Sequence, residues 1–433
     1  MNKGISGSRV SVRPLTSIDE RYLTSSVVWD ISRLAVSFVM SAPPSRSSSG
    51  GLNMPAFFEL FESLTHTFPR LRQKIMRPLL GIHAPAWVVD DKFDITWHVR
   101  RYPHVVAAQQ IPPRLLAGLE NGAMEPGRPP WDVLVAELDD GGLMMSLRYH
   151  HVVGDGMFGR SMVLELTRPK DVVRFVPAPL ARAPRNRIAV SFASARAFWG
   201  SVGSGREAWQ RINRVPIRRR LRRVAARNTR PLREWLGQRS GRLPAVARRE
   251  PRRLSLEFPA FRRYARTCGG GVGDLTAAVM AAALSKMAPE RERIQLMIPI
   301  SGRARGDDPA GNQVKVLVVD LPAGDDLARL TASVAAQVAQ ARNTGDFPPL
   351  QPGIWDAYAT FLPGPPRPGS ILGYAVHSVG AWTAMDPRER YGIVASTCGP
   401  QLELGMMTGQ GGDADALSAA VEEVVAATTR VSV

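Results

Sequence analysis

Residues 150–156 carry the side chains best suited to catalysis. They read His-His-Val-Val-Gly-Asp-Gly and hold two of the seven histidines in a chain of 433 residues. A neutral imidazole takes a proton from a hydroxyl or an amine, which is the task of a general base. This segment therefore predicts a base-catalysed transfer to an oxygen or nitrogen nucleophile.

The run before the histidine pair, residues 143–149, reads as a β-strand. Side chains on a strand alternate between its two faces, so His151 would share the apolar face and His150 the other. Burial on the apolar side keeps an imidazole neutral and able to accept a proton. We expect His151 to be the base, and His150 either to shape the site or to pack. A core histidine or a metal site with Asp155 are the alternatives for His151. Because adjacent strand residues point apart, we expect no metal.

Asp155 lies in a Gly-Asp-Gly turn just before a helix-like segment, residues 157–166. Aspartate is favoured in turns and at helix N-caps, where its carboxylate accepts backbone amide hydrogens. We expect Asp155 to cap this helix or to brace the loop through a salt bridge. Direct proton transfer by Asp155 is the alternative.

The pattern His-His-x-x-x-Asp-Gly resembles the active-site motif of the CoA-dependent acyltransferase and condensation-domain superfamily. Other segments, in order along residues 14–427, resemble the bacterial wax ester synthase/diacylglycerol acyltransferase family. They are residues 14–19, 22–23, 68–73, 87–88, 93–99, 126–132, 298–303, 311–314, 321–322 and 363–365. A single short match would be weak, but the ordered set is specific.

The resemblance implies an α/β fold with two chloramphenicol-acetyltransferase-like domains. Each would have a mixed sheet with flanking helices, and a channel between them would hold His151. It also implies an O-acyltransferase that moves a long-chain acyl group from acyl-CoA to diacylglycerol or a long-chain alcohol, giving triacylglycerol or wax ester. His151 would act as the general base without an acyl-enzyme, because no serine or cysteine nucleophile is paired with it in the motif. No cofactor is expected, since acyl-CoA is a substrate.

The same resemblance suggests roles for four further residues. Asp155 would pair with Arg303, which lies in a Pro-x-Ser-x-Arg-like segment of the second half. Gly156 would belong to the active-site loop. Asn312 is a candidate donor to the oxyanion of the tetrahedral intermediate. Gly364, between two prolines, would form a rigid turn near the channel and is a second substrate or oxyanion candidate.

The chain departs from the family pattern at two positions. Gly273 and Phe361 stand where the family has asparagines. These departures favour an alternative in which the chain binds acyl-CoA or lipid in a catalytically altered site. The intact His151 and Asp155 favour an enzyme. A third possibility is a condensation-type acyltransferase that takes its acyl group from a carrier protein.

The net charge of +18 has one source along the chain. Residues 182–253 contain 21 arginines, three acidic residues and no lysine, so the rest of the chain is neutral. Apolar and tryptophan side chains are interspersed at partly helical spacing, which favours an amphipathic contact with an anionic membrane or lipid droplet. A plain connector with a solvated basic face and a site that attracts CoA phosphates are the alternatives. We do not expect nucleic-acid binding, because no recognition module is present.

We divide the chain into residues 1–181, an N-terminal acyltransferase domain with the motif, 182–253, an Arg-rich connector, and 254–433, a C-terminal acyltransferase domain. Cys268 and Cys398 form no disulfide framework. The sequence shows neither a signal peptide nor a transmembrane stretch, so we expect a cytoplasmic protein peripherally associated with membrane or droplets. Helices are predicted over 55–76, 112–119, 274–287, 327–341 and 413–429, and strands over 133–138, 143–149, 294–300, 314–321, 391–397 and 401–407.

Overall fold

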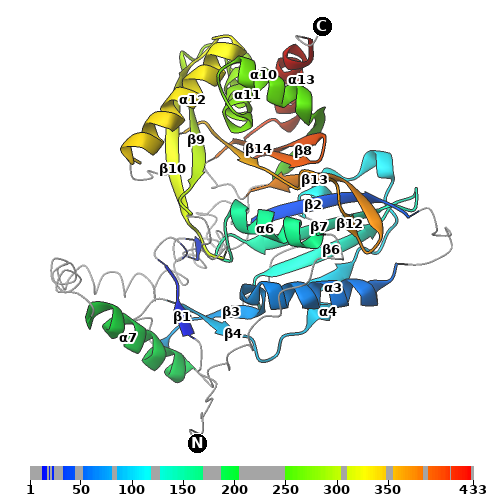
Figure 1. The fold of residues 1–433 in the computed structure, drawn as a ribbon, viewed down its shortest axis with the longest axis vertical. Coiled ribbons are helices and arrows are strands. Elements are labelled where there is room, and N and C mark those ends of the chain that lie inside the picture. The colour runs from blue at the N-terminus through cyan, green and yellow to red at the C-terminus, as the bar shows by residue number, and fades with distance from the viewer. Residues whose placement is uncertain are drawn as a thin grey trace, which may run out of the picture.

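Two six-stranded mixed sheets, each with helices packed on it, form the framework of the chain (Figure 1). The structure is a computed structural model. It describes residues 12–16, 19, 22–23, 33–43, 52–79, 85–118, 127–168, 187–203, 249–303, 310–347, 355–383, 389–409 and 411–430. The predicted α/β architecture with mixed sheets is confirmed.

The first sheet holds the histidine motif at the end of its strand β7. In spatial order its strands are β12 (Ser370–Ile371), β13 (Tyr374–Trp382), β2 (Arg33–Ser41), β7 (Leu143–His150), β6 (Trp131–Glu137) and β5 (Val99–Arg101). The predicted pair of strands is confirmed, because β6 and β7 run antiparallel with Trp131 opposite Tyr149. Every residue of β7 is buried. The strand is central and both of its faces are covered.

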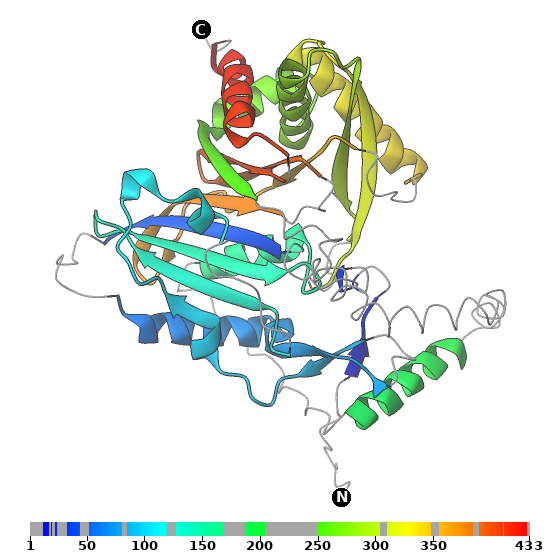
Figure 2. The same cartoon turned by 180° about the vertical axis from the view of Figure 1, so that it is seen from behind.

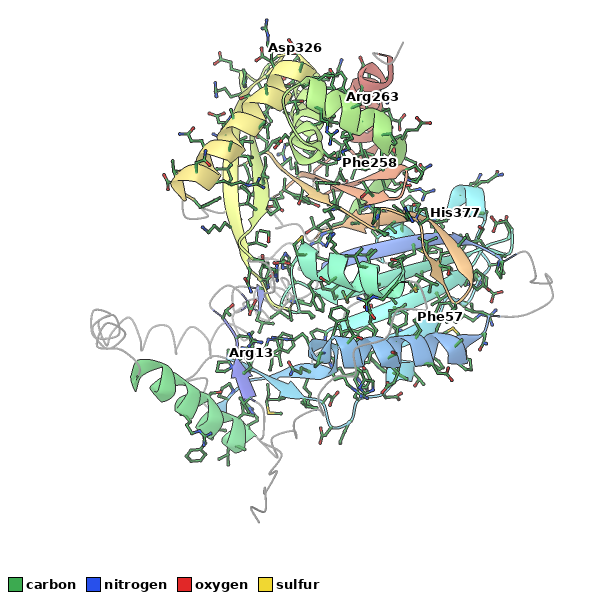
Figure 3. The ribbon with its side chains drawn as sticks, in the orientation of Figure 1. Arg13, Phe57, Phe258, Arg263, Asp326 and His377 are labelled. Atoms are coloured by element: carbon green, nitrogen blue, oxygen red, sulfur yellow. The ribbon has the colours of Figure 1, made fainter. Side chains whose placement is uncertain are left out.

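Two helices cover one face of this sheet, α3 (Met54–Thr67) and α6 (Gly156–Leu166). Alternate β7 residues, among them Leu147 and Tyr149, join their core, and Phe57 of α3, labelled in Figure 3, is buried there. The predicted helix over 55–76 is wrong beyond residue 67. Pro69 lacks an amide hydrogen and disfavours a helical conformation in the residue before it. The chain continues as a 3₁₀ turn and then as strand β3 (Gln73–Met76).

The second sheet belongs to the second half of the chain. In spatial order its strands are β10 (Val314–Pro322), β9 (Arg293–Ser301), β11 (Ala357–Leu362), β14 (Tyr391–Cys398), β15 (Gln401–Thr408) and β8 (Glu250–Glu257). The helices on its outer side are α10 (Phe258–Thr267), α11 (Val272–Met287), α12 (Leu327–Thr344) and α13 (Ala414–Arg430). The predicted helices over 274–287, 327–341 and 413–429 are confirmed. Small alanine side chains let α11 be buried against the sheet, α12 and α13 at once. The helix predicted over 112–119 is a single turn, α5 (Pro113–Leu116).

The two sheets are joined by an exchange of strands. β12 and β13 come from the second half of the sequence but extend the first sheet, where β13 pairs with β2. On its other side β13 lies against β14 and β15 of the second sheet. The division into residues 1–181, 182–253 and 254–433 stays a prediction, and the hydrogen-bonded sheets cross it at residues 370–382.

A third, small sheet supports an outlying helix (Figure 2). It contains β1 (Val12–Pro14), β4 (Ala86–Val89) and β3. Helix α7 (Arg187–Gly203) packs against β1 and buries Val190 beside β4. Of the predicted connector over 182–253, residues 182–186 and 204–248 lie outside the described residues. Among the described helices no single one is long and apolar enough to cross a membrane; α10 and α11 would meet that requirement only as a pair bent by 86°.

Candidate active site

His151 stands at the first position after β7, in the turn that leads into α6. The residue is half-buried. Its ring stacks on Tyr22, with 4.1 Å between ring centroids and 6° between ring planes. One face of the imidazole is therefore covered by the N-terminal segment of the chain.

Asn312 holds the Nδ1 edge of the His151 ring. His151 Nδ1 lies 2.7 Å from Asn312 Oδ1. Asn312 Nδ2 donates to the backbone carbonyl of His151 at 2.7 Å and to Asp19 Oδ1 at 2.8 Å. Both acceptors are oxygens that carry no hydrogen, so the amide orientation is determined and Oδ1 must face the ring. His151 therefore holds its proton on Nδ1, and the lone pair of Nε2 is available.

Burial lowers the pKa of His151. A backbone hydrogen bond at His151, the charge of Asp155, the hydrogen bond to Asn312 and, least, the charge of Asp19 oppose that shift. The net direction is downward. The imidazole is thus neutral near pH 7, the state that a general base requires.

His150 has a different environment. It is completely buried at the end of β7, and its Nδ1 accepts the backbone amide of Val152 at 3.0 Å. Burial, together with the neighbouring His151 and Arg33, lowers its pKa well below the usual value. Of the two open expectations for His150, this hydrogen bond favours shaping of the site, because the side chain holds the turn that carries His151.

Both expected roles of Asp155 other than proton transfer are confirmed. Its Oδ1 caps α6 by accepting from the amides of Met157 (3.0 Å) and Phe158 (3.3 Å). Its Oδ2 accepts from the amide of Gln313 at 3.1 Å and forms the predicted ion pair with Arg303. Each carboxylate oxygen is occupied, so the side chain braces the loop.

The active-site turn is held by the loop between β9 and β10. The amide of Gly311 donates to the Val153 carbonyl at 2.9 Å, and Arg303 Nη2 donates to the Gly311 carbonyl at 2.6 Å. On the opposite side Gly156 lies against the end of β11: a Cβ added there would come within 2.7 Å of Leu362 Cδ2. Gly156 thus permits close approach of α6 to the second sheet.

Two predicted oxyanion candidates need correction. Both amide hydrogens of Asn312 are already donated, which leaves none for a substrate oxygen. The amide of Gly364 donates to Thr397 Oγ1 at 2.9 Å, and a Cβ on Gly364 would lie 1.8 Å from the Thr397 carbonyl oxygen. Asn312 is therefore a partner of the histidine, and Gly364 a close-packed turn.

Sequence reasoning missed two residues of the site. Asp19 and Tyr22 were noted only as part of an N-terminal signature, although the structure brings both to His151. An acidic residue and an aromatic residue in that signature are the signal that the sequence offers. The Trp131 segment, by contrast, is core: its indole donates to the Leu71 carbonyl at 2.7 Å and stacks on His98 with 4.5 Å between centroids.

The two departures from the family pattern are neighbours in space. A Cβ added to Gly273, at the start of α11, would lie 3.5 Å from the Cβ of Phe361 in β11. This is an ordinary van der Waals distance. The ring of Phe361 thus accompanies the absence of a side chain at Gly273. Phe361 belongs to β11, the strand whose end contacts Gly156.

Comparison with known proteins agrees with the motifs. A family model described as the wax ester synthase/diacylglycerol acyltransferase catalytic domain matches residues 31–267, more than half of the chain. A Mycobacterium tuberculosis protein named as a diacylglycerol O-acyltransferase is 27% identical over 312 residues, covering 65% of this chain and 62% of that protein. Another from the same organism is 31% identical over 115 residues, covering 26% of this chain and 42% of its own length. The chain thus spans less than two thirds of the length of these relatives.

Solved structures share the fold over nearly the whole chain. The wax ester synthase/diacylglycerol acyltransferase from Marinobacter aquaeolei VT8 has a TM-score of 0.59 at 15% identity, covering 96% of this chain and 99% of that one. The first condensation domain of the CDA synthetase has a TM-score of 0.63 at 15% identity, covering 98% and 96%. At this identity the likeness establishes the two-sheet architecture alone.

Proposed function

The chain belongs to the wax ester synthase/diacylglycerol acyltransferase family, and from that premise we propose that it transfers a long-chain acyl group from acyl-CoA to a lipid hydroxyl. The acceptor would be diacylglycerol or a long-chain alcohol, and the products an ester and free CoA. The observation that carries the proposal is the state of His151. Its Nδ1 faces Asn312 Oδ1 at 2.7 Å and its ring stacks on Tyr22, which leaves Nε2 as the basic atom.

In the proposed reaction, His151 Nε2 takes the proton of the acceptor hydroxyl while its oxygen attacks the thioester carbonyl. A C–O bond forms, and the carbonyl oxygen of the tetrahedral intermediate carries the negative charge. Collapse of this intermediate breaks the C–S bond, and the imidazolium returns its proton to the CoA sulfur. One base thus serves both steps, and no acyl-enzyme is required.

Asp155 would contribute by holding the turn rather than by moving a proton. Its carboxylate caps α6 and pairs with Arg303, and both charged side chains are almost completely buried. A base must keep its position within a fraction of an ångström for efficient transfer. The ion pair links the turn to the second half of the chain, so it supports the geometry of His151.

The proposal is tested by measuring release of free CoA thiol from palmitoyl-CoA, with diacylglycerol and long-chain alcohols supplied in turn. We expect acceptor-dependent release that falls by about 10²–10⁴-fold in His151→Ala, the usual contribution of general acid–base catalysis. His66→Ala on the exposed side of α3 is the matched control and should behave like wild type.

Other results would favour the alternatives. Saturable binding of acyl-CoA without release for any acceptor would favour a binding protein, the reading that Gly273 and Phe361 suggest. Transfer from an acyl carrier protein but not from acyl-CoA would favour a condensation-type enzyme. Acceptor-dependent release that survives in His151→Ala would refute the assignment of the base.

We also propose that the protein contacts an anionic membrane or lipid-droplet surface through residues 182–253. Within this segment, α7 exposes 73% of Phe192 and 51% of Ile188 on its outer side. Arg187 and Arg196 are exposed on the same helix. Apolar side chains among arginines, in a segment with the entire excess charge of the chain, suit an interface with anionic lipid headgroups.

A further inference from the structure

We propose that Asp19 is a positioning residue of the active site, which fixes the tautomer of His151 through Asn312 and stabilises its protonated form. The inference rests on the proposed function only for its catalytic consequence. The tautomer and the titration of His151 are properties of the protein itself.

Two hydrogen bonds connect Asp19 in the N-terminal segment to His151 through Asn312. Asp19 is 3% exposed and Asn312 is 6% exposed. Asp19 Oδ1 accepts from Asn312 Nδ2 at 2.8 Å, and Asn312 Oδ1 faces His151 Nδ1 at 2.7 Å. Asp19 and Asn312 are 293 positions apart in the sequence, so this connection exists only in the folded chain.

Asp19 is itself held by its own segment. Its Oδ2 lies 3.4 Å from the amide nitrogen of Thr16, and its amide donates to Thr16 Oγ1 at 3.1 Å. This reciprocal pattern is a capping box. The carboxylate therefore reaches Asn312 from a fixed turn, and three residues further on Tyr22 covers the histidine ring.

The hydrogen-bonding chemistry of Asp19 and Asn312 explains how they fix the His151 tautomer and stabilise its protonated form. A carboxylate can only accept, so Asp19 requires the amide group of Asn312 to present nitrogen to it and oxygen to His151. Without Asp19, the His151 carbonyl would be the remaining acceptor that holds the amide nitrogen in place. An Asn312 that turned over would donate to Nδ1, place the histidine proton on Nε2 and remove the base. Because the neutral amide cannot take the proton from Nδ1, the negative charge stays one residue away, where it stabilises an imidazolium without direct proton transfer.

The charges that face His151 come from several elements. Asp155 of its own turn and Asp19 of the N-terminal segment are acidic, Arg303 is paired with Asp155, and the adjacent His150 is neutral. Burial lowers the pKa of His151, whereas Asp155, Asn312 and Asp19 raise it. Removal of the Asp19 charge should therefore lower the pKa further, and the acidic limb of the rate profile should move to lower pH.

The test uses the full chain labelled with ¹⁵N-histidine, with the His151 signals assigned by their loss in His151→Gln. Asp19→Asn keeps one oxygen, which can accept from Thr16 and preserve the capping box, but it turns an NH₂ group towards Asn312 and removes the charge. The matched control is Asp326→Asn, at the N-cap of α12 at the top of Figure 3, away from the histidine turn. Tautomer and titration midpoint of His151 are read by NMR, and kcat and KM are measured across pH for the acyl transfer.

We expect wild type and Asp326→Asn to hold the Nδ1–H tautomer alone. In Asp19→Asn a fraction of Nε2–H should appear, and the titration midpoint of His151 should move to lower pH, because a negative charge that raises its pKa is lost. The rate constant kcat should drop with KM little changed, since a base of lower pKa takes up a proton less readily and only the Nδ1–H tautomer has a free Nε2. An unchanged tautomer and midpoint in folded Asp19→Asn would overturn the inference. Absence of acyl transfer in wild type would instead refute the proposed function, and the NMR result would still decide the role of Asp19.

Discussion

Removal of the Asp155 carboxylate should destabilise the fold strongly, because it breaks a buried ion pair and removes a helix cap. The side chains of Asp155 and Arg303 are 2% and 9% exposed, so loss of the carboxylate removes one partner of a buried ion pair. Breaking one partner of such a pair costs about 3–5 kcal/mol. Loss of the α6 N-cap adds about 1 kcal/mol. Asp155→Ala should therefore lower the free energy of unfolding by about 4–6 kcal/mol, as much as the whole stability of many domains.

Asp155→Asn separates the two contributions. The amide oxygen can still accept from Met157 and Phe158, so the cap remains, whereas the charge and the Oδ2 contacts with Gln313 and Arg303 are lost. We expect a cost of about 3–5 kcal/mol. The double variant Asp155→Asn/Arg303→Met removes both charges and should recover more than half of that loss, because no unpaired ion is left in the interior.

Urea unfolding followed by tryptophan fluorescence and circular dichroism gives the midpoints of the four proteins, and CoA release gives their activities. The reasoning predicts that midpoint and activity fall together and that the double variant regains stability. If Asp155→Asn unfolds at the wild-type midpoint, the ion pair does not stabilise the fold. If it is fully stable but inactive, Asp155 takes part in the chemistry directly.

Two further predictions concern a turn and a surface. Gly364→Ala should lower the free energy of unfolding by about 2–3 kcal/mol, because its methyl group would overlap the Thr397 carbonyl oxygen, a backbone atom that cannot rotate away. Gly273→Ala is the control and should be tolerated, because its methyl group would lie at an ordinary contact distance. Equal urea midpoints for the two variants would contradict this account. The full chain should float with phosphatidylglycerol vesicles more than with phosphatidylcholine vesicles, and Phe192→Asp should reduce this preference. Val105→Asp, at a similarly exposed apolar residue outside the segment, should leave it unchanged. Equal flotation of both variants would exclude α7 as the contact.

Much of the candidate site could be predicted because its strongest signals are local. The strand that ends at His150, the Asp155 cap and the following helix lie within some 25 consecutive residues, where alternation and capping rules apply directly. The pair between Asp155 and Arg303 was predicted from two motifs, and the structure confirms it. Local rules also predicted four of the six strands of the second sheet, β9, β10, β14 and β15, and its three longest helices, but not the central strand β11.

What could not be predicted depends on which distant groups meet. Asn312 was noted as a hydrogen-bond donor, and that much is correct. Its acceptors are Asp19 and the carbonyl of His151, and no sequence pattern identifies them. The passage of β13 into the first sheet is equally non-local, since its pairing with β2 joins residues more than 330 positions apart.

That strand exchange has a consequence for how the protein is made. During synthesis the first half of the chain leaves the ribosome without β13, so β2 presents an unpaired edge until residue 382 has been translated. An exposed strand edge is a template for pairing with other chains. The first half of the chain should therefore be prone to aggregation when it is produced alone. The second half supplies the missing strand β13 and so completes the first sheet, as one subunit completes another in a strand-swapped assembly.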